Sequence, residues 1–317
     1  MRQLFVIATL SALLPLSFAA SPKLVRPAVA PLAAPTVAII AGAPLTVHVG
    51  SDFTFQVYNS AVPGSGQIYP DDANQTGDMG WFVRAGTTKY APDFSQHPGG
   101  TATESIGANT AWTVGTQSAV SGTGTAGDPY KVTTTNSLPT LSLTATQEVT
   151  YVNGENFFRK KMTLASSATS PLAASVFLGA DIYLAGSDSG VPQYVSSSPG
   201  GKDCAAGTYN ILLIPQGSVS PVAHSAKDYD VVWAEIGSGS LSNQVTPGCQ
   251  DNGAALQWNV NVPASGTAVI QAATSFGAIP TSITNGAPVD VPLLAPPALL
   301  LLIAGVGLVG ASRRRKL

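Results

Sequence analysis

Alternation of apolar and polar positions recurs along the middle of the chain. In the segment 52–58, the side chains of Phe53, Phe55 and Val57 share one face. A period of two residues is typical of half-buried β-strands. Between residues 45 and 278, no stretch of twelve residues combines a helical period with caps. Strands are therefore predicted at 45–49, 52–58, 80–85, 130–135, 141–152, 156–164, 174–184, 208–214, 229–236, 255–262 and 266–273.

Turn-forming residues separate these strands. Asn153 and Gly154 lie between two of them, and this dipeptide is a strong hairpin signal. The chain of 317 residues has 32 Gly and 24 Pro. Only 10% of its residues are charged, against about 25% in an average soluble protein. This pattern predicts an all-β fold, a large antiparallel β (super)sandwich over residues 45–280.

The first 19 residues have the three parts of a secretory signal peptide. Arg2 supplies the positive charge, residues 4–16 form an apolar run, and Ser17 and Ala19 are the small residues of a cleavage site. The run is shorter than the roughly 20 residues that cross a bilayer. Residues 1–19 are thus predicted to form a signal helix that directs export. The Pro- and Ala-rich residues 20–44 are expected to form a linker.

The C-terminal part of the sequence has the features of a membrane anchor. After a linker at 281–292, residues 293–311 carry no charge. They are long enough to cross about 30 Å of hydrocarbon as a transmembrane helix. Residues 312–317 form a basic tail, which the positive-inside bias places in the cytoplasm. Its cations are Arg313, Arg314, Arg315 and Lys316.

The motif before this helix resembles a known bacterial sorting signal. Val291, Pro292 and Leu294, followed by the apolar helix and the Arg cluster, resemble the tripartite PEP-CTERM and IPTL-CTERM tails. The motif is closer to the second pattern, because it contains no Glu. The resemblance implies a Gram-negative envelope and a membrane-embedded sorting protease as a partner. The departure from either consensus leaves open whether the tail is cleaved or remains as an anchor.

The chain contains two cysteines, Cys204 and Cys249. An exported protein meets an oxidising compartment, where a pair of thiols persists as a disulfide. Such a bridge closes a loop of about 45 residues and stabilises the fold by roughly 4 kcal/mol in the chain-entropy model. The alternative is two free thiols.

Three aspartates are the strongest candidates for a ligand site. Asp188 and Asp251 lie beside Ser or Asn, and Asp181 lies two residues after Gly179. Calcium takes about six to eight oxygen ligands, which carboxylates and turn carbonyls supply. The favoured alternative is that these side chains build turns by bonding to their own backbone. A second oxygen-rich segment, without the spacing of an EF-hand, contains Asp71, Asp72, Asn74 and Asp78.

The four tryptophans divide into two pairs. Trp233 and Trp258 lie in apolar runs and are expected to be buried, as Trp usually is in a β-sandwich. Trp81 and Trp112 stand among Gly and Thr and are expected to be the more exposed pair. Exposed rings at these two positions would form a platform on which a sugar stacks.

No catalytic motif is evident. The three histidines, His48, His97 and His224, have no metal-ligand spacing, and no G-x-S-x-G sequence occurs. Glu155 and Glu235 would form a glycosidase pair only if folding brought them within about 5 to 10 Å.

Several segments occur in an order that resembles bacterial surface proteins whose β supersandwich is similar to the galactose-mutarotase-like fold. The resemblance spans roughly residues 45–278. It implies the fold and proximity to carbohydrate, but not mutarotase activity, whose acid–base pair of His and carboxylate has no counterpart that the sequence identifies. The segments are Tyr151-Val152-Asn153-Gly154-Glu155, Phe157-Phe158-Arg159, residues 179–190 and residues 251–258.

The distribution of charge along the chain limits the classes of partner that it can bind. The net charge is −2, and the only strong cationic cluster is the C-terminal one, so nucleic-acid binding has no electrostatic support. The sequence favours an envelope-anchored surface protein with a structural or adhesive role in the envelope or extracellular matrix. Its expected partners are the membrane and an envelope polysaccharide, with calcium as the one cofactor considered. A carbohydrate-binding module is the alternative, and a carbohydrate-active enzyme is less favoured.

Overall fold

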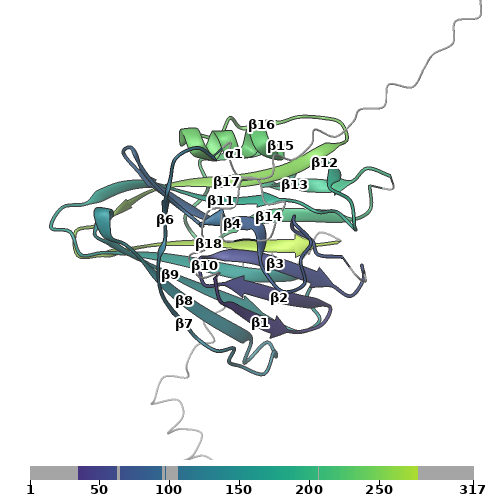
Figure 1. Cartoon of the computed structure of the whole chain (residues 1–317), viewed down its shortest axis with the longest axis horizontal. Helices are drawn as coiled ribbons and strands as arrows, with labels where there is room; N and C mark the ends of the chain where they lie inside the picture. Colours follow the sequence, from purple (N-terminus) through teal and green to yellow (C-terminus); the bar gives the residue numbers. More distant parts are fainter. Residues whose placement is uncertain (1–34, 63–64, 95–96, 98–105, 206, 278–317) are drawn as a thin grey trace, which may run out of the picture.

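The computed structural model describes residues 35–62, 65–94, 97, 106–205 and 207–277 (Figure 1). The predicted signal peptide, sorting motif, transmembrane helix and basic tail lie outside these ranges. Among the helices within them, none is long and apolar enough to cross a membrane.

The described chain is mainly antiparallel β-structure, as predicted. Its strands fold into two layers, which are joined where β12 pairs with β17. The first layer has the order β1 (Val37–Ala41), β2 (Leu45–Gly50), β3 (Thr54–Asn59), β4 (Gly77–Ala85), β11 (Leu172–Asp181), β17 (Gln250–Val262), β15 (Ala223–Asp228) and β16 (Gln244–Val245). In addition, β5 (Thr88–Ala91) pairs with β4, and β6 (Thr110–Ala111) pairs with β5. The second has the order β7 (Thr113–Gln117), β8 (Tyr130–Leu138), β9 (Leu143–Tyr151), β10 (Phe157–Ser166), β18 (Thr267–Phe276), β14 (Asn210–Gln216), β13 (Ser198–Asp203) and β12 (Ser189–Val195).

The main core lies between the two layers. Alternate residues of the longer central strands point into it, including Phe53, Phe55 and Val57 from the predicted face. Trp81 of β4 and Trp258 of β17 lie side by side there, with ring centroids 5.9 Å apart. The predicted hairpin at Asn153–Gly154 is confirmed, since β9 and β10 pair across it and Gly154 has a positive φ of 90°.

One predicted strand is wrong. Residues 229–236 belong to a helix, α1 (Tyr229–Ser238). Its buried residues are Tyr229, Val232, Trp233 and Ile236, which is the i, i+3, i+4, i+7 spacing of a helical face. Asp228 caps the start by accepting a hydrogen bond from the Asp230 N–H, and Gly239 ends the helix in the left-handed conformation. The helix has ten residues, which is shorter than the twelve-residue pattern sought in the sequence.

Two glycines let α1 lie directly on the outer face of the first layer (Figure 1). A Cβ on Gly179 of β11 would lie 2.6 Å from Ile236 Cδ1, and one on Gly253 of β17 would lie 2.7 Å from Tyr229 Cα. Trp233 packs against Phe82 of β4, with ring centroids 5.4 Å apart. A second, smaller apolar cluster therefore forms between α1 and the sheet.

Several further strands lie where none was predicted. Residues 37–41, placed in the 20–44 linker, form β1 and pair with β2, because Val-Ala-Ile-Ile suits a strand. The β12–β13 hairpin is rich in Ser, Gly and Pro, and such composition gives little strand signal.

The predicted disulfide is confirmed. Cys204 and Cys249 are bonded, with their Cα atoms 5.6 Å apart. The bond ties the end of β13 to the start of β17.

Candidate functional site

The three aspartates that the sequence singled out come together at one end of α1. Asp181 ends β11, Asp188 immediately precedes β12, and Asp251 is the second residue of β17. Sheet register explains their proximity, because Asp181 pairs with Gly253, and Asp251 pairs with the residue after Asp188. One carboxylate oxygen from each lies within 4.8 Å of the others.

The aspartate cluster is held firmly in the fold. Asp181 and Asp251 are buried, whereas Asp188 is partly exposed. The Tyr69 N–H donates to the Asp181 carbonyl at 3.1 Å, and the Ile182 N–H donates to the Asn252 carbonyl at 2.8 Å. Both carboxylate-bearing strand ends are thus fixed by backbone bonds.

The first turn of α1 adjoins the cluster. Burial, and then the negative charges of Asp230, Asp181 and Asp251, raise the pKa of Tyr229 far above its usual value. Tyr229 therefore remains a neutral phenol at physiological pH. Three carboxylates at this distance repel one another, and a hard cation or shared protons relieve that repulsion. Asp181, Asp188 and Asp251 are the residues that could hold calcium.

The second oxygen-rich segment builds turns, as the alternative interpretation held. The Asp71 carboxylate accepts from the Gly66 N–H at 2.8 Å, and Asp72 accepts from the Asn74 N–H at 2.8 Å. Asp78 lies apart from them, buried in β4.

A buried His–Asp pair escaped the sequence analysis. His97 Nε2 lies 2.8 Å from Asp52 Oδ2, and its Nδ1–H donates to the Thr76 carbonyl at 3.0 Å. Burial by itself lowers the pKa of His97, but the charge and hydrogen bond of Asp52 outweigh it and raise the pKa to about 8. Burial raises the pKa of Asp52, but His97 more than compensates, so that this pKa lies below its usual value. The two residues are 45 positions apart in sequence, and no local pattern links them.

The His97–Asp52 pair is closed to solvent. The His97 side chain is 0% exposed and the Asp52 side chain 7%. Thr54 Oγ1 donates to the other oxygen of Asp52 at 2.5 Å, and Thr54 and Thr76 are themselves hydrogen-bonded at 2.6 Å. The pair therefore ties the β2–β3 turn to the start of β4, and no substrate reaches it in this conformation.

The two candidate glutamates lie in different parts of the molecule. Glu155 follows the β9–β10 turn in the second layer and forms a two-bond ion pair with Arg159, at 2.6 and 3.1 Å. Glu235 lies on α1, outside the first layer, and pairs with Lys227. The structure does not bring them together as a glycosidase pair.

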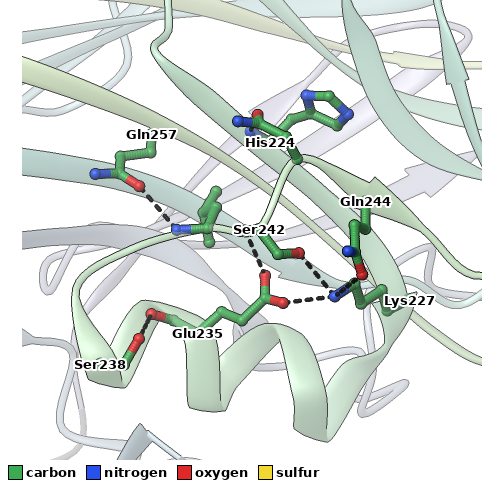
Figure 2. A network of polar contacts seen from close by, with 9 residues as sticks. His224, Lys227, Glu235, Ser238, Ser242, Gln244 and Gln257 are labelled. Atoms are coloured by element: carbon green, nitrogen blue, oxygen red, sulfur yellow. Dashed lines mark hydrogen bonds and ion pairs between the residues drawn. The ribbon is translucent and has the colours of Figure 1, made fainter.

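Glu235 belongs to a polar network that joins α1 to β15 and the segment after the helix (Figure 2). Lys227 Nζ donates to Glu235 Oε1 at 2.6 Å and to Ser242 Oγ at 2.7 Å. Burial raises the pKa of Glu235, but hydrogen bonds from Lys227 and Ser242 outweigh this effect, and the pKa is lowered. The Lys227 amine therefore bonds at once to a carboxylate on α1 and to the segment after the helix, and the network acts as a structural tie.

The expected exposure of Trp81 and Trp112 is wrong. Trp81 is 0% and Trp112 is 5% exposed, because both strands lie over the main core. Trp112 packs edge-on against Phe53, with centroids 5.0 Å apart. Neither ring offers a face to a sugar. The predicted burial of Trp233 and Trp258 is confirmed.

A different aromatic pair is exposed. Tyr194 of β12 is 44% exposed and stacks on His224 of β15, with centroids 3.7 Å apart and planes 5° from parallel. Asn243 holds His224 from both sides: its side chain accepts the His224 N–H, and its own N–H donates to the His224 carbonyl. Burial lowers the pKa of His224, so the imidazole is neutral at neutral pH. Alternation in β12 is weak, so no local pattern predicts this stack.

Comparison with known proteins finds only distant structural likeness. No protein-family model and no curated protein matches the sequence. A bacterial glucoamylase complexed with acarbose overlaps 81% of this chain and 35% of its own, with 9% identity and a TM-score of 0.43. A TPR-domain-containing protein from Parabacteroides distasonis overlaps 77% of this chain and 48% of its own, with 9% identity and a TM-score of 0.44. The chain thus spans less than half the length of either protein.

A third likeness is to a galactose mutarotase-like protein from Lactobacillus casei. It overlaps 76% of this chain and 100% of its own, with 11% identity and a TM-score of 0.33. Overlaps this distant assign no activity or substrate to the chain.

Proposed function

We propose that the chain is an exported surface protein, held at a bacterial envelope by its C-terminal segment, with a structural or adhesive role in the envelope or extracellular matrix. The N-terminal signal-peptide pattern and the resemblance of the tail to sorting signals support export. The Cys204–Cys249 bond also supports it, because structural disulfides persist in oxidising compartments.

The observation that supports a structural or adhesive role most directly is that the acid–base groups named above are engaged in contacts within the fold. The one His–carboxylate pair found among the described residues is closed to solvent. Glu155, Glu235 and Lys227 each belong to an ion pair that ties neighbouring elements. Groups engaged in this way stabilise a scaffold, whereas general acid–base catalysis needs a group within reach of a bound substrate.

A matched pair of strains tests the role. Cells that lack the gene should show weaker adhesion or a more permeable envelope than wild-type cells, and a plasmid copy of the gene should restore the wild-type behaviour. Unchanged adhesion and envelope integrity in the deletion strain would contradict the proposal. Turnover of any sugar substrate by the purified chain would favour an enzyme instead.

The intact mass of the protein from its native envelope tests export and anchoring. A mass that lacks residues 1–19 and is two hydrogens lighter than the reduced chain would support export and the disulfide. Loss of the residues after about position 292 would indicate processing by a sorting protease, whereas their retention would indicate a plain membrane anchor. A mass that retains residues 1–19 would contradict the proposed signal peptide.

A carbohydrate-binding module is the alternative function, and the exposed Tyr194–His224 stack favours it. A neutral aromatic surface with one free ring face suits stacking of a sugar ring. Tyr194→Ala should then remove binding to the glycans that a glycan array identifies. An array without hits would rule this alternative out.

A further inference from the structure

A shallow depression of about 510 Å³ lies on the outer face of the first layer, just beyond the C-terminal end of α1. Its floor is made of small residues, among them Gly86, Ala173 and Gly239. Its polar side chains are Arg84, Ser175, Asn259 and Asn261, and none of the described residues that line it carries a carboxylate.

Sheet register places three of these side chains in a row. Ser175 of β11 pairs directly with Arg84 of β4 on one side and with Asn259 of β17 on the other. Ser175 Oγ donates to Asn259 Oδ1 at 2.9 Å, and Gln257 Nε2 donates to the same oxygen at 3.1 Å. Because its oxygen is occupied, Asn259 offers the depression its NH₂ group, which is a donor.

Arg84 is held in place by backbone carbonyls. Its Nε donates to the Gly86 carbonyl at 3.1 Å, and its Nη1 donates to the Ser238 carbonyl in the last turn of α1. A Cβ on Gly239 would overlap this guanidinium, so the glycine makes room for it. The remaining N–H groups of Arg84, on Nη1 and Nη2, are free to form charge-assisted bonds to an anion.

A second cation lies next to Arg84. Lys89 of β5 pairs with Arg84 in the sheet and donates to the Gly237 carbonyl at 3.3 Å. Burial, and then the charge of Arg84, lower the pKa of Lys89. The C-terminus of a helix carries about half a negative charge. The positive charges of Arg84 and Lys89 together exceed this partial negative charge, so this end of α1 attracts anions.

We propose that this depression binds the carboxylate groups of an acidic polysaccharide. Arg84 donates charge-assisted hydrogen bonds to the carboxylate, and Asn259 and Asn261 donate hydrogen bonds to hydroxyl groups of the sugar ring. The inference rests on the adhesive role proposed above and names its ligand. The depression is shallow and open, so an internal unit of a polymer can lie across it. The Val260 side chain packs against the main core, so among the described residues no sizeable apolar side chain faces the depression to hold the side chains of a peptide.

Binding to polygalacturonate, with its fully methyl-esterified form as the neutral counterpart, tests the inference. The chain is expressed from its full-length sequence and purified as the cell processes it. Wild-type protein should bind polygalacturonate and not the ester, because esterification removes the charge that Arg84 recognises. Asn261→Asp places a negative charge at the rim, where Asn261 is exposed, and should weaken binding by about tenfold or more.

Two controls separate this site from general electrostatics. Lys131→Gln changes the net charge by the same single unit at an exposed position of β8 in the other layer, and should leave binding unchanged. Asn261→Ser should bind far better than Asn261→Asp. Equal binding of both polymers, or equal weakening by Asn261→Asp and Lys131→Gln, would overturn the inference. So would the absence of any binding, while adhesion lost in the deletion strain would still support the proposed role through another surface.

Discussion

Lys160 is the side chain whose surroundings least suit its charge. It is 1% exposed on β10, lies 4.3 Å from the centroid of the Phe158 ring, and donates to Thr274 Oγ1. Burial lowers its pKa well below the usual value. The folded state thus favours neutral Lys160, and the fold loses stability as pH falls below 10.5, the ordinary lysine pKa, towards the lowered one.

Replacement of this lysine should stabilise the protein. Lys160→Met keeps a long flexible side chain among the phenylalanines and removes the desolvated amine, and we expect the free energy of unfolding at pH 7 to rise by about 1 kcal/mol or more. Urea unfolding measures the change. Lys161→Met, which removes a half-exposed lysine next to it, should change stability by only about 0 to 1 kcal/mol. A loss of stability in Lys160→Met would show that the amine is needed in the core.

His97 gives the fold a pH dependence of the opposite sign. Its pKa is raised from 6.5 to about 8, so its contribution is fully present below pH 6.5 and is lost as pH rises through 8. This shift corresponds to about 2 kcal/mol. Asp52, whose pKa is lowered, contributes above pH 3.8, and that contribution is lost as pH falls through its lowered pKa. The His97–Asp52 pair therefore stabilises the fold most between pH 3.8 and pH 6.5.

His97→Gln should flatten the decline in stability between pH 6.5 and 8. The midpoints of urea unfolding, measured for the wild type and the variant at a series of pH values, compare the two declines. His224→Gln is the control, because the pKa of His224 is lowered from 6.5, and its titration therefore cannot cause a loss of stability as pH rises. A decline that persists in His97→Gln would mean that another group titrates there.

At the scale of elements, α1 shows what sequence reasoning captured and what it missed. The strands with clear alternation, such as β3 and β10, were predictable because each has one face in the core. The burial pattern and caps of α1 were also present in the sequence, but in a segment with Val231, Val232 and Trp233, which favour strands. For the aspartate cluster, the sequence identified the three residues but not their proximity in space. Its geometry depends on β11, β12 and β17 becoming neighbours, and no local pattern encodes that.

The close contact between α1 and the sheet predicts that Gly179 tolerates no side chain. Gly179→Leu should destabilise the protein by about 1–3 kcal/mol or more, because the added atoms overlap Trp233 and Ile236. Gly127→Ala is the control, since a Cβ there meets nothing within 4 Å. Thermal unfolding of both variants compares them. If both were equally stable, α1 would have to be free to lift from the sheet.

At the scale of the whole molecule, the disulfide links segments 45 residues apart, close to the place where the two layers join. The double variant Cys204→Ser/Cys249→Ser should lose about 4 kcal/mol of stability in the chain-entropy model. Thermal unfolding with and without a reductant measures this. Reductant should lower the midpoint of the wild type and leave that of the double variant unchanged. A wild-type midpoint that is insensitive to a reductant shown to open the bond would contradict the prediction.

The place of β18 determines how the molecule would respond to mechanical tension. It is the last described strand, and it is paired along its length with β10 on one side and β14 on the other. In the proposed tethered protein, a pull on the bound polymer is resisted at the anchor and enters the fold through the end of β18. Force along the strand loads both ladders in shear, so many hydrogen bonds share it at once, whereas an edge strand would be peeled away one bond at a time. A surface protein tethered in this way would withstand drag that unzips a fold anchored through its rim.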